Sequence, residues 1–89
     1  MILMMPYMTI KGDVEVLHSK MDKHGFMTVH FEKPDSKNCF NEMDIVLPSM
    51  TVTKNVGFSD EEVNEFLLFC SRNATAMSIY SALGGVVNA

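Results

Sequence analysis

Three histidines and one aspartate come closest to a metal-ligand set in this 89-residue chain: His18, His24, His30 and Asp22. Imidazole nitrogens and carboxylate oxygens bind Zn²⁺, and a β-hairpin can bring the ends of two strands together. No pair of the four has a recognised metal-binding spacing, and His30 falls in the middle of an expected strand. Two interpretations follow, a histidine-based metal site or solvent-facing side chains on a hairpin. We favour the second, and expect neither a metal nor a cofactor.

The two cysteines, Cys39 and Cys70, lie far apart, and the chain has no CxxC pair. Isolated cysteines are typical of a reducing compartment, so we expect a cytoplasmic protein. A nucleophilic thiol needs a base within hydrogen-bond reach. Cys39 has no histidine near it in sequence, and Cys70 falls on the expected core face of a helix. No catalytic residue is therefore predicted, and we expect the chain not to be an enzyme.

The charge balance argues against nucleic acid as the main partner. The chain has 11 acidic and 7 basic residues and a formal net charge of −4, whereas phosphate binding needs a positive surface. Four acids, Asp60, Glu61, Glu62 and Glu65, could suggest a cation site, but a helix dipole alone favours acids in its first turn. No stretch approaches the ~20 apolar residues of a membrane span, so no membrane insertion is expected.

The N-terminal stretch is apolar but lacks the features of a signal peptide. It has no basic region, and Pro6 interrupts its apolar run. The methionines in this stretch leave Met5 and Met8 as alternative start positions. We therefore treat residues 1–7 as a candidate disordered segment ahead of the folded domain.

Alternation of apolar and polar side chains predicts an antiparallel sheet over residues 8–54. Gly12 interrupts the first alternating stretch and suggests a bulge there. Pro48 lacks an N–H group for the sheet ladder, so the third strand should end or kink at this residue. The expected strands cover residues 8–17, 26–32, 39–47 and, as a short edge strand, 50–54.

A helix is predicted over residues 59–84. Ser59 can cap its N-terminus, and Glu62 can complete a capping box. Gly84 and Gly85 supply the left-handed conformation that ends many helices. One apolar stripe at helical spacing should lie on the sheet. Its members are Val63, Phe66, Leu67, Cys70, Ala74 and Met77.

A second set of apolar helix residues does not fit that stripe. Residues 71–73 contain weak helix formers, so the helix could break there and turn a second face inward. Alternatively, the helix is continuous and its far side meets another protein. On this second interpretation the predicted interface consists of Leu68, Phe69, Ile79, Tyr80 and Leu83.

Together these patterns predict a single α+β domain spanning residues 1–89. An antiparallel meander of three to four strands should precede one long or kinked C-terminal helix, or two helices, packed on the sheet. Short connections favour pairing between consecutive strands.

Residues 43–89 also resemble the C-terminal halves of short bacterial proteins of unknown function. The resemblance is carried by 45–48 (Ile-Val-Leu-Pro), by 55–62 (Asn-Val-Gly-Phe-Ser-Asp-Glu-Glu), by Arg72-Asn73 and by 83–86 (Leu-Gly-Gly-Val). Such domains occur on mobile elements and near toxin–antitoxin genes. The resemblance implies a bacterial cytoplasmic setting and a binding role, and it defines no catalytic residues.

The leading functional hypothesis is a small, non-enzymatic protein-interaction module. Surplus apolar surface favours a homodimer, or another protein as partner. The alternative is a toxin–antitoxin-type regulator or accessory protein, because an acidic chain could bind a basic partner through charge complementarity. A histidine-based metal-binding protein is the third hypothesis.

Overall fold

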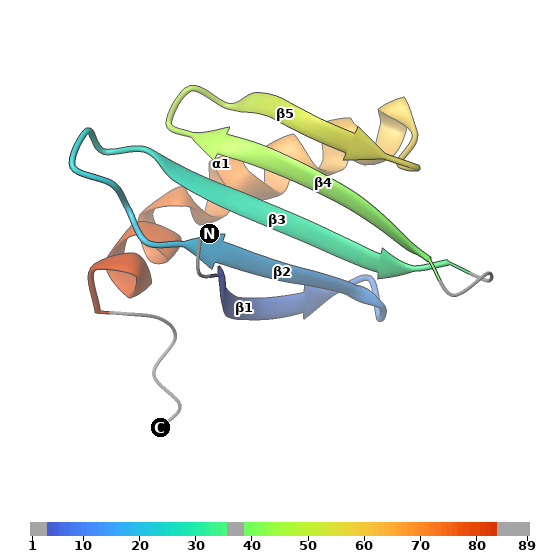
Figure 1. Cartoon of the computed structure of the whole chain (residues 1–89), viewed down its shortest axis with the longest axis horizontal. Coiled ribbons are helices and arrows are strands. Elements are labelled where there is room, and N and C mark those ends of the chain that lie inside the picture. The colour runs from blue at the N-terminus through green and yellow to red at the C-terminus, as the bar shows by residue number, and fades with distance from the viewer. Residues whose placement is uncertain (1–3, 36–38, 84–89) are drawn as a thin grey trace.

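The computed structural model describes residues 4–35 and 39–83, which form an α+β fold of five antiparallel strands followed by one helix. Each strand pairs with its neighbour in sequence, so the sheet order is β1-β2-β3-β4-β5 (Figure 1). Short connections make such a meander the entropically cheapest way to pair the strands. The elements are β1 (Met4–Ile10), β2 (Val14–Ser19), β3 (Met27–Pro34), β4 (Phe40–Leu47), β5 (Thr51–Val56) and α1 (Asp60–Leu83).

The α+β order is confirmed, but the sheet has five strands where three to four were expected. The single strand predicted over 8–17 is in fact two strands, β1 and β2, which are joined by a turn. Lys11 and Gly12 in this turn have positive φ angles of 53° and 85°, a conformation that glycine adopts without strain. Gly12 therefore reverses the chain and does not form a bulge. The irregularity in this hairpin lies in β1, between Pro6 and Met8.

Three further boundaries differ from the prediction. Residues 4–7 belong to β1, and Met4, Met5 and Pro6 pair with β2, so this part of the candidate disordered segment is folded. β3 continues through Pro34, which pairs with Phe40 where the β3–β4 hairpin meets its connecting segment. A proline is tolerated at a strand end, where no ladder donor is needed. β5 likewise continues through Val56, two residues beyond the expected edge strand.

α1 is one continuous helix and passes through residues 71–73 without a break. Asn73, a weak helix former, is held by two hydrogen bonds. Its Nδ2 donates to the carbonyl of Phe69 at 2.9 Å, and its Oδ1 accepts from the Tyr7 hydroxyl at 2.8 Å. A contact with β1 thus supports the helix where its own propensity is low.

The predicted capping box at the start of α1 is confirmed. The Ser59 hydroxyl accepts from the backbone N–H of Glu62 at 3.2 Å, and a Glu62 carboxylate oxygen accepts from the N–H of Ser59 at 3.1 Å. Gly84 and Gly85, predicted to end the helix, lie outside the described residues. Among the described residues, no helix combines the length and apolar character needed to cross a membrane.

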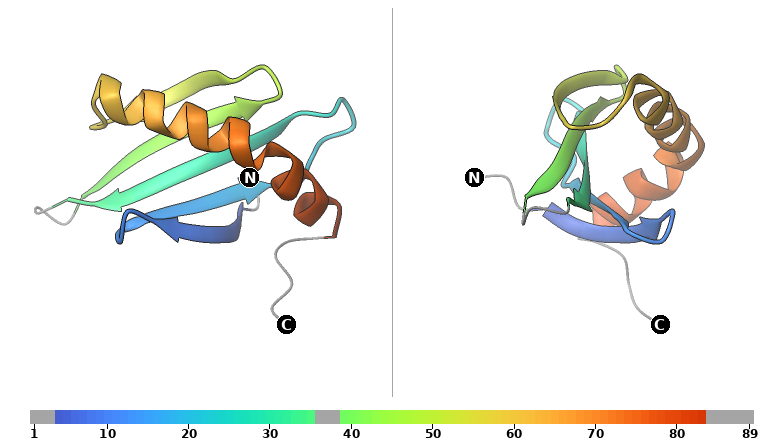
Figure 2. Two further views of the ribbon diagram at one scale, coloured as in Figure 1. Left: turned by 180° about the vertical axis from the view of Figure 1, so that it is seen from behind. Right: turned by 90° about the vertical axis from the view of Figure 1, so that its right-hand side faces the viewer.

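α1 covers one face of the sheet and leaves the other face open. It runs diagonally, from the β4–β5 side of the sheet to the β1–β2 side (Figure 2). The predicted stripe is confirmed, because Phe66, Cys70 and Met77 are fully buried and the rest of the stripe packs against the core. Phe66 stacks on Phe31 of β3, with ring centroids 4.5 Å apart. Burial of each large side chain contributes ~1.5–3 kcal/mol, so this layer dominates stability.

In the second apolar set of the helix, some side chains pack half-buried against β1 and others are exposed. Phe69 and Tyr80 contact Tyr7 of β1, with ring centroids 6.2 Å and 5.9 Å apart. Leu68, Ile79 and Leu83 are exposed. The extra strand β1 therefore covers two side chains that had no place in the predicted three- to four-stranded sheet.

Candidate functional site

The four residues of the predicted metal set do not come together. His18 is fully buried on the helix-covered face of the sheet, whereas His30 lies on β3 at the open face. His24 and Asp22 are exposed in the connection between β2 and β3. A metal site made of these four residues is therefore not formed.

Asp22 organises the turn that holds His24. One carboxylate oxygen of Asp22 accepts hydrogen bonds from the backbone N–H groups of His24 and Phe26, at 2.8 Å and 2.9 Å. These backbone hydrogen bonds, with that of Phe26 the strongest influence, lower the pKa of Asp22. The carboxylate shapes the loop and is already occupied by backbone donors.

His18 is a buried polar side chain inside the core. Its Nδ1 lies 3.0 Å from the carbonyl oxygen of Ser19, which can only accept, so Nδ1 carries the proton. Its Nε2 is buried without a hydrogen-bond partner among the described residues. The ring of Tyr7 meets the imidazole edge-on at 6.1 Å. His18 is thus a packing residue, and the solvent-facing interpretation does not hold for it.

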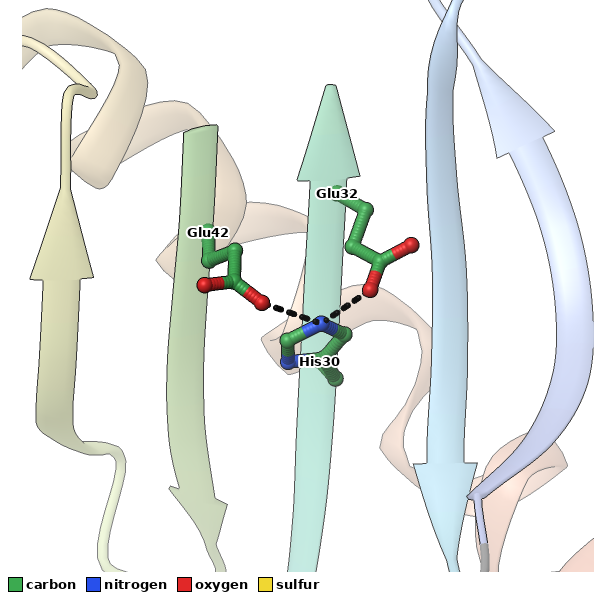
Figure 3. A group of neighbouring side chains, drawn as sticks. All are labelled: His30, Glu32 and Glu42. Carbon is green, nitrogen blue, oxygen red and sulfur yellow. Dashed lines mark hydrogen bonds and ion pairs between the residues drawn. The ribbon is translucent and has the colours of Figure 1, made fainter. Parts of the chain in front are cut away.

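His30 is the centre of a group of charged side chains on the open face. Its Nδ1 lies 2.5 Å from a carboxylate oxygen of Asp44, and its Nε2 lies 2.9 Å from Oε1 of Glu32. Glu42 approaches the same Nε2 at 3.8 Å. Figure 3 shows Glu32 of β3 and Glu42 of β4 converging on this nitrogen from neighbouring strands. We call His30, Glu32, Glu42 and Asp44 the open-face cluster.

Strand alternation and register build the open-face cluster. His30 and Glu32 are two residues apart on β3, and Glu42 and Asp44 are two residues apart on β4, so each pair points to one face. The β3–β4 register sets His30 opposite Asp44 and Glu32 opposite Glu42. The side chain of His30 is only 12% exposed, because its neighbours surround it.

The electrostatics of the cluster favour a positive charge at the imidazole. Burial by itself lowers the pKa of His30, but hydrogen bonds and charges from Asp44 and Glu32 outweigh it, so the pKa is raised. A carboxylate can only accept, which places a proton on Nδ1 facing Asp44. In the charged imidazole, Nε2 also carries a proton and donates a hydrogen bond to Glu32. In the neutral imidazole, Nε2 instead presents a lone pair between the carboxylates of Glu32 and Glu42.

Acidic residues also face one another directly across three strands. Glu15 of β2 is the register partner of Glu32, which in turn is the partner of Glu42. Like charges directly opposite one another on a sheet are destabilising. Lys54 of β5 compensates in part, since its Nζ lies 3.2 Å from Oε2 of Glu42. The three acids of this row therefore leave the open face with a local excess of negative charge, which Lys54 only partly neutralises.

The sequence alone identified His30 but not its partners. Alternation along the strands assigns Glu32, Glu42 and Asp44 to the outward face, but it does not show that they are neighbours. The available signal was a His-x-Glu pair on one strand followed by a Glu-x-Asp pair on the next. Only the register of the hairpin brings the two pairs together.

An apolar cavity of about 290 Å³ lies beneath the β2–β3 connection, beside the middle of α1. Methionines supply much of its wall, since Met21, Met27 and Met50 all line it, together with Pro48 and Ser78. Methionine is unbranched and adapts to irregular spaces. The wall of this cavity is therefore adaptable in shape.

The outer side of α1 carries the remaining candidate interface. Leu68, Ile79 and Leu83 are 49%, 55% and 64% exposed. A shallow groove runs beside Leu68, between α1 and the end of β1. Of the five predicted interface residues, the structure leaves these three at the surface and packs Phe69 and Tyr80 against Tyr7.

Comparisons with protein-family models, with curated proteins and with solved structures find no match to this chain. The resemblance of residues 43–89 to short bacterial proteins therefore stays a prediction. Two surfaces of the described residues are the candidates for function, the outer side of α1 and the open face of the sheet.

Proposed function

We propose that this protein is a small, non-enzymatic interaction module that forms a homodimer through the outer side of α1. The observation that supports the proposal is the exposure of Leu68, Ile79 and Leu83 on a helix whose inner side is already filled. Large exposed apolar groups on one surface favour association. A chain of this size also gains stability by burying further surface in a dimer.

The spacing of the three residues suits an antiparallel pairing of two α1 helices. Leu68 and Leu83 are fifteen residues apart in sequence, which corresponds to about 22 Å along the helix. Midway between them lie the small side chains of Thr75 and Ala76, which would let two helices approach closely at a two-fold axis. In that arrangement Leu68 of each copy meets Leu83 of the other.

Other features fit the same proposal. Cys39 and Cys70 are free thiols, consistent with a cytoplasmic setting. We also propose a bacterial protein encoded on a mobile element, as the resemblance of residues 43–89 implies. A toxin–antitoxin-type role remains the alternative, and it would make the partner a basic protein.

The test is light scattering coupled to size exclusion at two protein concentrations. We expect a dimer for the natural chain, and a folded monomer for Leu68→Glu and for Leu83→Glu, because a carboxylate would be buried at the apolar contact between these two residues. Circular dichroism establishes that each variant is folded.

The matched control is Phe40→Glu, which makes the same change of charge at an exposed apolar residue on β4. This variant should remain a dimer. A monomeric natural chain at both concentrations would refute the homodimer, and loss of assembly in Phe40→Glu alone would move the interface to the sheet.

A further inference from the structure

We propose that His30, Glu32 and Glu42 bind one divalent first-row metal ion of the Zn²⁺ type, at the open face of the sheet. This site differs from the predicted histidine set and shares only His30 with it. It lies on the opposite side of the molecule from the proposed dimer surface, so neither proposal depends on the other.

The spacing of the ligand atoms fits a single ion. Nitrogen and oxygen ligands bind Zn²⁺ at about 2.0–2.2 Å, so adjacent ligand atoms in a tetrahedral site are about 3.3 Å apart. The distances from His30 Nε2 to the carboxylate oxygens of Glu32 and Glu42 are 2.9 Å and 3.8 Å. One ligand atom from each of the three residues lies within 4.8 Å of the others. Both carboxylates point toward Nε2 in Figure 3, and rotation of these partly exposed side chains would equalise the distances.

Asp44 orients the imidazole as metal sites require. A metal-bound histidine usually donates its second ring N–H to a carboxylate, which fixes the tautomer and makes the ligating nitrogen more basic. Asp44 accepts from Nδ1 of His30, and Nε2 therefore faces the two glutamates.

The charges around the site match a divalent cation. Glu32, Glu42 and Asp44 are acids, and Lys54, bonded to Glu42, is the neighbouring base among the described residues. A metal ion would take the place of the proton on Nε2, and with the imidazole then neutral the three acids and Lys54 carry a net charge of −2. Because Glu32 stands directly between Glu15 and Glu42 in the register, a bound cation would also relieve repulsion within that row.

Three protein ligands leave part of the coordination sphere for solvent. The side chains of Glu32 and Glu42 are 33% and 32% exposed, so an ion can enter directly from the open face. One nitrogen and two oxygens suit Zn²⁺ and its first-row neighbours, whereas Ca²⁺ prefers six to eight oxygen ligands.

The experiment is calorimetric titration of the chelator-treated full chain with Zn²⁺ alone, followed by titration with Co²⁺ monitored by visible absorption. We expect one equivalent of Zn²⁺ per chain. Asp44→Asn should weaken binding ~10–100-fold by releasing the imidazole from its orientation. His30→Gln should weaken it more than that, since it removes a ligand.

The matched control is His24→Gln, which removes an exposed histidine far from the cluster in the β2–β3 connection and should leave the affinity unchanged. Glu32→Gln and Glu42→Gln provide a second route if His30→Gln does not fold, and each should weaken binding. Binding of less than a tenth of an equivalent of Zn²⁺ would overturn the site. Equal loss in His24→Gln and His30→Gln would do the same, whereas a dimer-disrupting Leu68→Glu should retain the metal.

Discussion

The face of the sheet beneath α1 is apolar and closed to solvent, whereas the opposite face carries a histidine ringed by carboxylates. Both faces are built from the same strands, because alternate residues of β3 and β4 point to opposite sides. Phe31 is fully buried under Phe66, while its neighbours His30 and Glu32 lie on the open side. Adjacent residues of β3 therefore alternate between the apolar core and the charged open face.

The difference concerns how each face is held together. On the covered face, burial of many apolar side chains supplies the free energy, and no single pair is decisive. On the open face, a few charged groups interact through defined distances, and their sum is modest in water. The covered face should therefore respond strongly to loss of volume, and the open face to changes of charge or to a cation.

The largest expected effect is on the covered face. Phe66→Ala should lower the free energy of unfolding by ~3–5 kcal/mol, because it leaves a cavity against Phe31 and Phe58. Urea unfolding of the two proteins measures this. Phe40→Ala is the control, since it removes the same side chain from an exposed position on β4, and it should cost under ~1 kcal/mol. A loss below ~1 kcal/mol for Phe66→Ala would contradict the assigned core.

Thiol labelling at pH 8 tests how tightly the covered face is closed. Burial raises the pKa of the Cys70 thiol to about 12, so no reactive thiolate is present while α1 is packed. Cys39 is exposed and serves as the internal reference. We expect Cys70 to react on the order of 100-fold more slowly than Cys39, because only open molecules are labelled. Equal rates would mean that α1 separates readily from the sheet.

The smallest expected effect concerns charge on the open face. Glu15→Lys should raise the free energy of unfolding by ~0.2–1 kcal/mol in the presence of chelator, since a base would then stand opposite Glu32. Salt near 1 M should reduce the gain through screening. Asp13→Lys makes the same change of charge at the neighbouring turn, beside Lys11, and should give no gain. Equal stability of the two variants would argue against repulsion within the acidic row.

Local patterns predicted much of the fold. The capping box at Ser59 and Glu62 depends on residues three apart, and the apolar stripe of the helix depends on helical spacing, so both are visible in the sequence. The strands β3 and β4 were found, within a few residues, from alternation. The turn at Lys11 and Gly12 was missed, because a short alternating segment reads the same whether the chain reverses within it or continues.

Long-range placement could not be read in the same way. The sequence did not reveal that Tyr7 contacts Phe69, Tyr80 and Asn73, since these contacts join β1 to a helix more than sixty residues away. Two predicted interface residues, Phe69 and Tyr80, are therefore half-buried against Tyr7, and the helix stays continuous at Asn73 with a hydrogen bond from β1.

The sequence by itself determined an α+β chain with an amphipathic sheet and one capped helix, because these features follow from local spacing. It also determined that His30, Glu32, Glu42 and Asp44 point outward, because alternation assigns the face. Only the tertiary structure decided that they meet at one point, since strand register sets which outward residues are neighbours. It likewise decided that His18 is buried and His24 exposed, because burial depends on what another part of the chain places over each residue.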